Sequence, residues 1–149
     1  MRWSDDSVED RLEVSDIREI LETGRSPTIE FFESVPDEFD LVKEACGLGN
    51  RSGGVILIGV NNNSELEGLV DAEERIDEIA EIFEDWIEPD FSYDLYPIGI
   101  DGSNILVARI IKYTKTESAL PFAVKGQFFH RKAKRSYPMS PSTLDGLMS

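Results

Sequence analysis

The chain has 149 residues, of which 40% are hydrophobic, so it can bury the core of one ordinary domain and lies outside the composition of disordered proteins. It carries 30 acidic residues against 15 basic ones, and its single cysteine and single histidine exclude an intramolecular disulfide and a Cys/His zinc cluster. No apolar run approaches the roughly 18 residues of a membrane helix, so we expect a soluble, cytoplasmic protein.

The first half of the sequence predicts a helix, a strand and a second helix. Ser15 offers an N-cap, apolar residues follow at helical spacing and Gly24 is a stop signal, which predicts a helix within residues 4–23. Residues 28–35 are β-branched and aromatic enough for a short strand. A second helix, over residues 37–48, follows a proline and carries its apolar residues on one stripe.

A glycine-rich bend at residues 49–54 leads into six apolar residues, 55–60, typical of a central strand covered on both faces. These glycines follow a helix and precede a strand, the reverse of a dinucleotide fingerprint, so we predict the start of a strand and no phosphate cradle. An amphipathic helix over 71–87, a hairpin around Asp101-Gly102 and a strand over 127–132 follow. The order indicates an α+β (mixed α/β) domain; strand order cannot be read from it.

Three blocks of the sequence, GRSPTIEFFES, GNRSGGVILIGVNNN and FFHRKAKRSYPMSPSTL, occur in register over residues 19–144. Together they resemble the Schlafen AlbA-like (AlbA-2 type) domains of many prokaryotic proteins, which are described as DNA-binding. The matching positions are Asn50, Gly53, Gly54, Gly59, Val60 and Arg131. The resemblance implies a single domain over 1–149, built from a central β-sheet with flanking helices.

Some Schlafen relatives cleave RNA with three acidic residues, which suits Mg²⁺ or Mn²⁺ catalysis. The matching positions here are Arg25, Glu30 and the Asn61/Asn62 turn. A guanidinium cannot bind a cation and an amide carries no full charge, so we expect no nuclease activity, no cofactor and Glu30 as a remnant. The alternative is a metal-dependent ribonuclease that uses other acids, such as Glu33.

The C-terminal segment, residues 125–149, holds five basic and one acidic residue, against 10 basic and 29 acidic in residues 1–124. It interleaves cations, which can bind phosphates, with aromatic rings, which can stack on bases. Together with the bend it gives our candidate nucleic-acid-binding residues: Asn50, Arg51, Gly53, Gly54, Lys125, His130, Arg131, Lys132, Lys134, Arg135 and Tyr137. Strand alternation places Phe128 and His130 on one face and Phe129 and Arg131 on the other. Alternatively, the segment is a solvated strand that balances the protein's own acidic helices.

The net charge of −15 favours either a basic partner or a protein adapted to high salt, such as a haloarchaeal one. The acids are spread over many elements and not gathered in one tail, which favours the second. In about 1 M salt the screening length is near 3 Å, so binding would depend on close contacts. We therefore expect a non-catalytic DNA- or RNA-binding protein, such as a transcriptional regulator or a ribosome-associated factor. The alternative is a protein–protein interaction module on the same fold, and homo-oligomerisation stays open.

Overall fold

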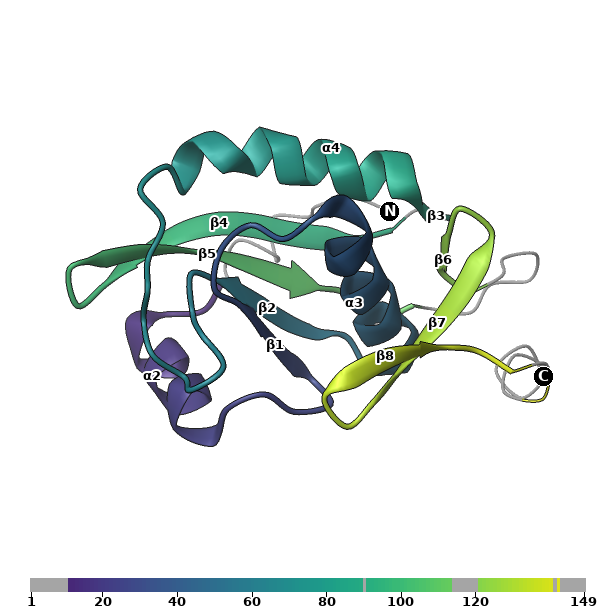
Figure 1. Ribbon diagram of the computed structural model, residues 1–149, viewed down its shortest axis with the longest axis horizontal. Coiled ribbons are helices and arrows are strands. Elements are labelled where there is room, and N and C mark those ends of the chain that lie inside the picture. Colours follow the sequence, from purple (N-terminus) through teal and green to yellow (C-terminus); the bar gives the residue numbers. More distant parts are fainter. Residues whose placement is uncertain (1–10, 90, 114–120, 141, 143–149) are drawn as a thin grey trace.

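The computed structural model describes residues 11–89, 91–113, 121–140 and 142, which form two β-sheets and three α-helices (Figure 1). The first sheet has the strand order β1-β2-β5-β4, with β1 and β2 parallel and the other neighbours antiparallel. Its strands are β1 (Ile29–Phe32), β2 (Gly54–Ile58), β4 (Tyr93–Ile100) and β5 (Ser103–Ile110). The predicted α+β class is confirmed.

The second sheet is smaller, antiparallel throughout, and has the order β3-β6-β7-β8. Its strands are β3 (Ile87–Glu88), β6 (Ala123–Val124), β7 (Gln127–Lys132) and β8 (Arg135–Pro138). β7 confirms the strand predicted over 127–132. β3, β6 and β8 were not predicted, because strands of two to four residues carry too little periodicity to be recognised.

The three helices are α2 (Val14–Thr23), α3 (Glu38–Arg51) and α4 (Ile76–Trp86), and a 3₁₀ turn, η1 (Glu73–Arg75), leads into α4. α3 links the two parallel strands β1 and β2 and lies between the first sheet and the β7–β8 hairpin (Figure 1). No helix in the described part of the chain is long and apolar enough to cross a membrane.

Apolar side chains cover both faces of the first sheet. Ile56 and Leu106 belong to the core that α3 and α4 share with the second sheet, whereas Leu57 and Val107 face the other way, towards Ile17 of α2. Each fully buried side chain of this kind contributes roughly 1.5–3 kcal/mol. The prediction of a strand covered on both faces within residues 55–60 is thus confirmed, although the strand itself spans Gly54–Ile58.

The bounds of all three helices differ from the prediction. The helix predicted over 71–87 is α4, which begins five residues later, at Ile76, after the 3₁₀ turn η1. α2 is capped by Glu13, which exchanges hydrogen bonds with Asp16 in a capping box, so Ser15 lies inside the helix. Residues 4–10 of that predicted helix lie outside the described residues. α3 begins after Asp37, whose side chain accepts a hydrogen bond from Asp40 N at 2.9 Å, and it runs three residues beyond the predicted end. The extension places Asn50 in the last turn of the helix.

The glycine-rich bend closes α3 and starts β2. Gly53 has a φ of 77°, and its N–H donates to Leu48 O at 2.8 Å, which ends the helix in the left-handed conformation that glycine favours. A Cβ on Gly53 would lie 2.7 Å from Ile110 O, and one on Gly54 would overlap the Thr28 carbonyl. The bend is therefore the predicted start of a strand, and it needs glycine for its own close packing.

Candidate functional site

A polar pocket of about 280 Å³ opens between β1, the N-terminal half of α3 and the start of β8. Three cations and three carboxylates line it, with two phenylalanines and one amide. The lining residues are Arg25, Glu30, Phe31, Phe32, Asp40, Lys43, Glu44, Asn62 and Arg135. The pocket is thus close to neutral in a chain whose net charge is −15.

The pocket contains the positions that the resemblance aligned with a nuclease site. Arg25, Glu30 and Asn62 all line it, although Asn62 lies 32 residues after Glu30 in the sequence. Asn61 has a different role, because its amide donates to Glu65 and Glu67 and its carbonyl accepts from Asn63 N, which holds the turn after β2. Of the two asparagines proposed for the third position, the structure brings only Asn62 to the pocket.

Arg131 lies behind the pocket in the protein interior, with 1% of its surface exposed. Its Nη1 donates to Glu44 Oε1 at 2.7 Å and to Glu30 Oε2 at 3.3 Å, and its Nη2 donates to the carbonyls of Ser26 and Ile29, both at 2.9 Å. The guanidinium thus joins β7 to β1 and α3. Both of its Nη atoms are already engaged inside the fold and the side chain is buried, so we remove Arg131 from the residues expected to contact phosphate.

Arg25 shares Glu30 with Arg131. Its guanidinium forms an ion pair with the Glu30 carboxylate, and its Nη2 also donates to Lys134 O at 2.8 Å, in the turn between β7 and β8. Two guanidinium groups therefore surround one carboxylate that is 3% exposed. Within the described residues, no group of three or more His, Cys, Asp or Glu side chains is arranged to hold a metal ion.

Asn50 is also an interior residue, with 7% of its surface exposed. Its Nδ2 donates to Phe122 O at 2.9 Å and to Phe129 O at 2.8 Å, and its Oδ1 accepts from Phe122 N at 2.9 Å. These bonds fasten the end of α3 to β7 and to the chain before β6. Asn50 is therefore a structural residue, and like the buried Gly53 it leaves the candidate interface.

The other cations at this end of the molecule are accessible. Lys132, Lys134 and Arg135 are exposed and form no ion pair with any described residue. Arg51 is exposed as well, and its Nη1 donates to the Arg131 carbonyl at 3.1 Å. With Arg25 and Lys43, the other two cations that line the pocket, they form what we call the basic surface: Arg25, Lys43, Arg51, Lys132, Lys134 and Arg135.

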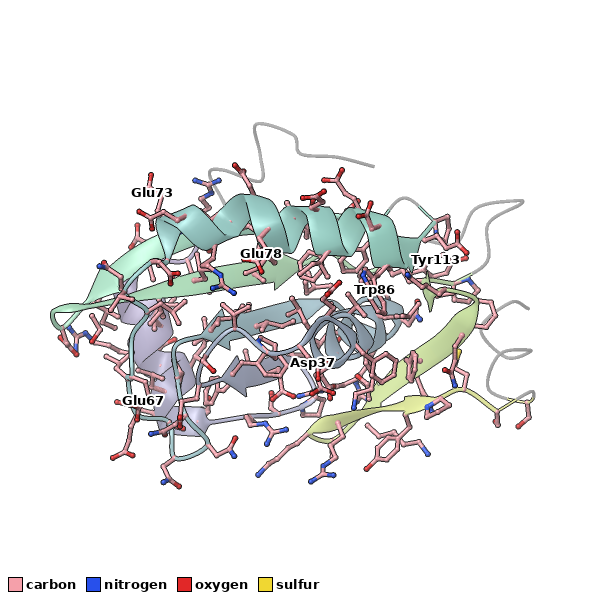
Figure 2. All side chains as sticks on the ribbon, turned by 45° about the horizontal axis from the view of Figure 1, so that its top comes forward. Asp37, Glu67, Glu73, Glu78, Trp86 and Tyr113 are labelled. Carbon is pink, nitrogen blue, oxygen red and sulfur yellow. The ribbon has the colours of Figure 1, made fainter. Side chains whose placement is uncertain are left out.

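Lys125 lies apart from this surface. It forms the turn between β6 and β7, with a φ of 46°, and its Nζ sits 4.1 Å from the ring centroid of Trp86, a residue labelled in Figure 2. The length of β7, about 17 Å, separates it from Lys132. The sequence analysis grouped Lys125 with the other cations of the C-terminal segment, but in the structure it lies at the opposite end of β7 from Lys132.

The acidic residues concentrate elsewhere. Residues 71–86 hold eight acidic side chains and one basic one, whereas residues 131–135 hold four basic side chains and no acidic one. Figure 2 shows Glu73 and Glu78 on η1 and α4, at the other side of the molecule from β8. The fold thus separates the two charge signs, which the net charge alone conceals.

Sequence reasoning missed the contribution of α3 to the site. Asp40, Lys43 and Glu44 line the pocket, and Glu44 is 6% exposed. A signal was present, because Glu44 lies three residues after Leu41 and four before Leu48, on the stripe of α3 that is buried. An acid on a buried stripe requires a partner, and here the partner is Arg131.

Comparisons with known proteins agree with this fold. No curated protein matches the sequence. Among solved structures, the DIP2311 protein from Corynebacterium diphtheriae superposes with a TM-score of 0.62 at 17% identity, over 85% of this chain and 26% of that one. This chain thus spans about a quarter of the length of that protein.

A second solved structure is the N-terminal domain of a protein described as related to the ATP-dependent DNA helicase RecG, from Nitrosomonas europaea. It superposes with a TM-score of 0.61 at 17% identity, over 87% of this chain and 91% of that domain. At such identities the likeness shows a shared fold. In sequence, the Schlafen, AlbA_2 family model matches residues 26–140, which include β1, α3, the pocket and the β7–β8 hairpin. The chain therefore belongs to the Schlafen, AlbA_2 family.

Proposed function

We propose that this chain binds nucleic acid through the basic surface and does not cleave it. The observation that carries the proposal is the group of exposed cations without ion pairs, Lys132, Lys134 and Arg135, beside the pocket of a strongly acidic protein. Phosphates are the ligands that such a group neutralises, and each contact releases counterions. The neighbour described as related to a DNA helicase supports a ligand of this class.

Retained carboxylates do not by themselves make a metal site in this pocket. Glu30 is bound by Arg25 and Arg131, and Glu44 is bound by Arg131. A divalent cation would have to displace guanidinium groups from both carboxylates, and breaking such a buried pair costs about 3–5 kcal/mol. We therefore propose that the pocket orients phosphates through Arg25, Lys43 and Arg135, without hydrolysis.

Adaptation to high salt is part of the proposal, because the net charge of −15 repels nucleic acid at low ionic strength. In about 1 M salt this repulsion is screened within about 3 Å, while close contacts of arginine and lysine with phosphate persist. The protein is thus expected to bind over a range of salt in which purely long-range attraction has vanished.

The test is binding of fluorescently labelled RNA and DNA in a salt series from about 2 M KCl downwards. The double variant Lys132→Glu/Arg135→Glu should abolish binding. Its matched control is Arg18→Glu/Arg75→Glu, which changes the net charge equally but removes only surface ion pairs with Asp101, Asp71 and Glu78. If both doubles bind alike, or the wild type binds neither ligand at any salt, the proposal is wrong and a protein partner becomes the hypothesis to pursue.

Cleavage is tested separately with the same labelled strands, incubated with Mg²⁺ or Mn²⁺ and analysed for length. We expect intact strands. Cleavage by the wild type that disappears in Glu30→Gln would overturn the non-catalytic assignment and favour a rearranged metal site.

A further inference from the structure

The β7–β8 hairpin presents one face to the outside, and its composition follows from the register. His130 lies opposite Tyr137, and Lys132 lies opposite Arg135, so each pair shares a face of the hairpin. His130 is partly buried and the other three are exposed; Tyr137, at 45%, is one of the few exposed large aromatic residues. The outer face therefore carries a pair of rings next to a pair of cations.

The inner face of the same hairpin is fully occupied. Phe129 packs edge-on against Phe39 of α3 at 6.0 Å between ring centroids, and Arg131 binds Glu44 of α3. Gly47 lies so close to the hairpin that a Cβ there would overlap Ser136. α3 thus backs the hairpin along its length, so the outer face is a supported platform and not a free ribbon.

The composition of the outer face decides between double-stranded and single-stranded ligands. In the major groove of DNA the base edges are read chiefly by hydrogen-bonding side chains, whereas two of the four side chains on this face, His130 and Tyr137, are aromatic rings. A flat face with exposed rings needs bases whose faces are free, and only unpaired nucleotides offer them. The adjacent cations, in a chain with few of them, call for an anionic ligand.

We propose that the outer face of the β7–β8 hairpin binds single-stranded nucleic acid, with a base stacked on Tyr137 and His130 and the neighbouring phosphates held by Lys132 and Arg135. This inference rests on the proposed function and names its ligand class. The spacing is suitable, because successive outward residues on a strand lie about 6.8 Å apart, so a ring and the next cation can serve one nucleotide.

The state of His130 agrees with a stacking role. Partial burial and the nearby charge of Lys132 lower its pKa from the usual 6.5, so at neutral pH the ring is an uncharged imidazole. The charges on this face that contact phosphate are then those of Lys132 and Arg135, and the two rings supply apolar area. The pocket cation Arg135 belongs to both regions, so the strand can continue from the platform towards the pocket.

The test compares three ligands in fluorescence anisotropy, all at one salt concentration: a 12-nucleotide thymidine strand, an abasic strand of equal length and charge, and a blunt duplex. The wild type should bind the thymidine strand about 5- to 150-fold more tightly than the abasic one, the range of one stacked base. Tyr137→Thr replaces the ring by a β-branched residue that also suits a strand, and it should remove this difference, leaving abasic binding unchanged. Tyr137→Phe, which keeps the ring, should bind as the wild type does.

The outcomes separate the two proposals. If none of the ligands binds, the proposed function itself fails. If thymidine and abasic strands bind alike and Tyr137→Thr changes neither, nucleic-acid binding stands and the stacking face is refuted. If the duplex binds more tightly than the single strand, the assignment of the ligand class is wrong.

Discussion

Replacing Arg131 by methionine tests the assignment of this residue to the protein interior. The substitution keeps an unbranched side chain of similar length but removes the charge and the bonds to Glu44, Glu30 and two carbonyls. Both carboxylates, of which 3% and 6% is exposed, would lose the cation that they share. The prediction is a large loss of stability from a residue that the sequence places in a basic, phosphate-binding run.

The expected magnitude follows from the burial of these groups. Breaking a buried ion pair costs about 3–5 kcal/mol, a sizeable part of the roughly 5–15 kcal/mol that stabilises a typical domain. At about 2–4 °C per kcal/mol, Tm should fall by about 6–20 °C. Arg135→Met, four residues along the chain and exposed, should change the free energy of unfolding by no more than about 0.5 kcal/mol.

Urea denaturation followed by circular dichroism at one fixed salt concentration gives both free energies. A third variant, Arg131→Met/Glu30→Gln/Glu44→Gln, removes the stranded charges and should recover part of the loss. The reasoning is refuted if Arg131→Met is as stable as the wild type while it no longer binds nucleic acid, because that result would make Arg131 a ligand-binding residue after all.

Three further predictions concern single side chains. Burial raises the pKa of the Cys46 thiol to about 12, so an aromatic disulfide reagent at pH 8 should modify this thiol only after the protein is unfolded in urea. If the thiol of the native protein reacted as fast as that of the unfolded protein, the buried position of Cys46 would be contradicted. Asn50→Leu leaves Phe122 N and Phe129 O without their hydrogen-bond partner, so it should lower the free energy of unfolding by about 2–4 kcal/mol, measured by urea denaturation. A loss of less than about 0.5 kcal/mol would show that these groups find other partners. The pKa of His130 lies below the usual 6.5, so its protonation on acidification adds a positive charge that should tighten nucleic-acid binding. The same protonation should destabilise the fold, because the unfolded histidine binds the proton more strongly. Both pH trends between 7.5 and 5.5 should be weaker in His130→Gln than in the wild type, and equal trends in the two proteins would contradict this.

Periodicity predicted the larger elements because their side chains meet two distinct environments. The stripe of residues 76–86 and the apolar run of β2 both follow from this rule, and the Asp101-Gly102 turn adopts the positive φ angles, 51° and 81°, that its composition favours. The two-residue strands β3 and β6 exist only through their partners. No local pattern could have revealed them.

Alternation along β7 predicted that Phe129 and Arg131 share a face, and the structure agrees, since both are buried. It could not say that this face turns inward. From the sequence alone, an arginine in a basic strand is expected to be exposed. In the structure it is buried because Glu44 of α3 and Glu30 of β1 pair with it. The sequence distance to these partners, 87 and 101 residues, puts the pairing beyond any local rule.

The sequence by itself determined the charge of the protein, its main helices and strands, the glycine bend and the alternation of the basic strand, because each depends on neighbours within a few residues. The tertiary structure alone decided which charges are free. It placed Arg131 and Asn50 inside the fold, moved Lys125 to the far end of β7, and left Lys132, Lys134, Arg135 and Tyr137 outside. The physical reason is that α3 packs on one face of the β7–β8 hairpin, and the residues that it covers there are removed from solvent whatever their charge.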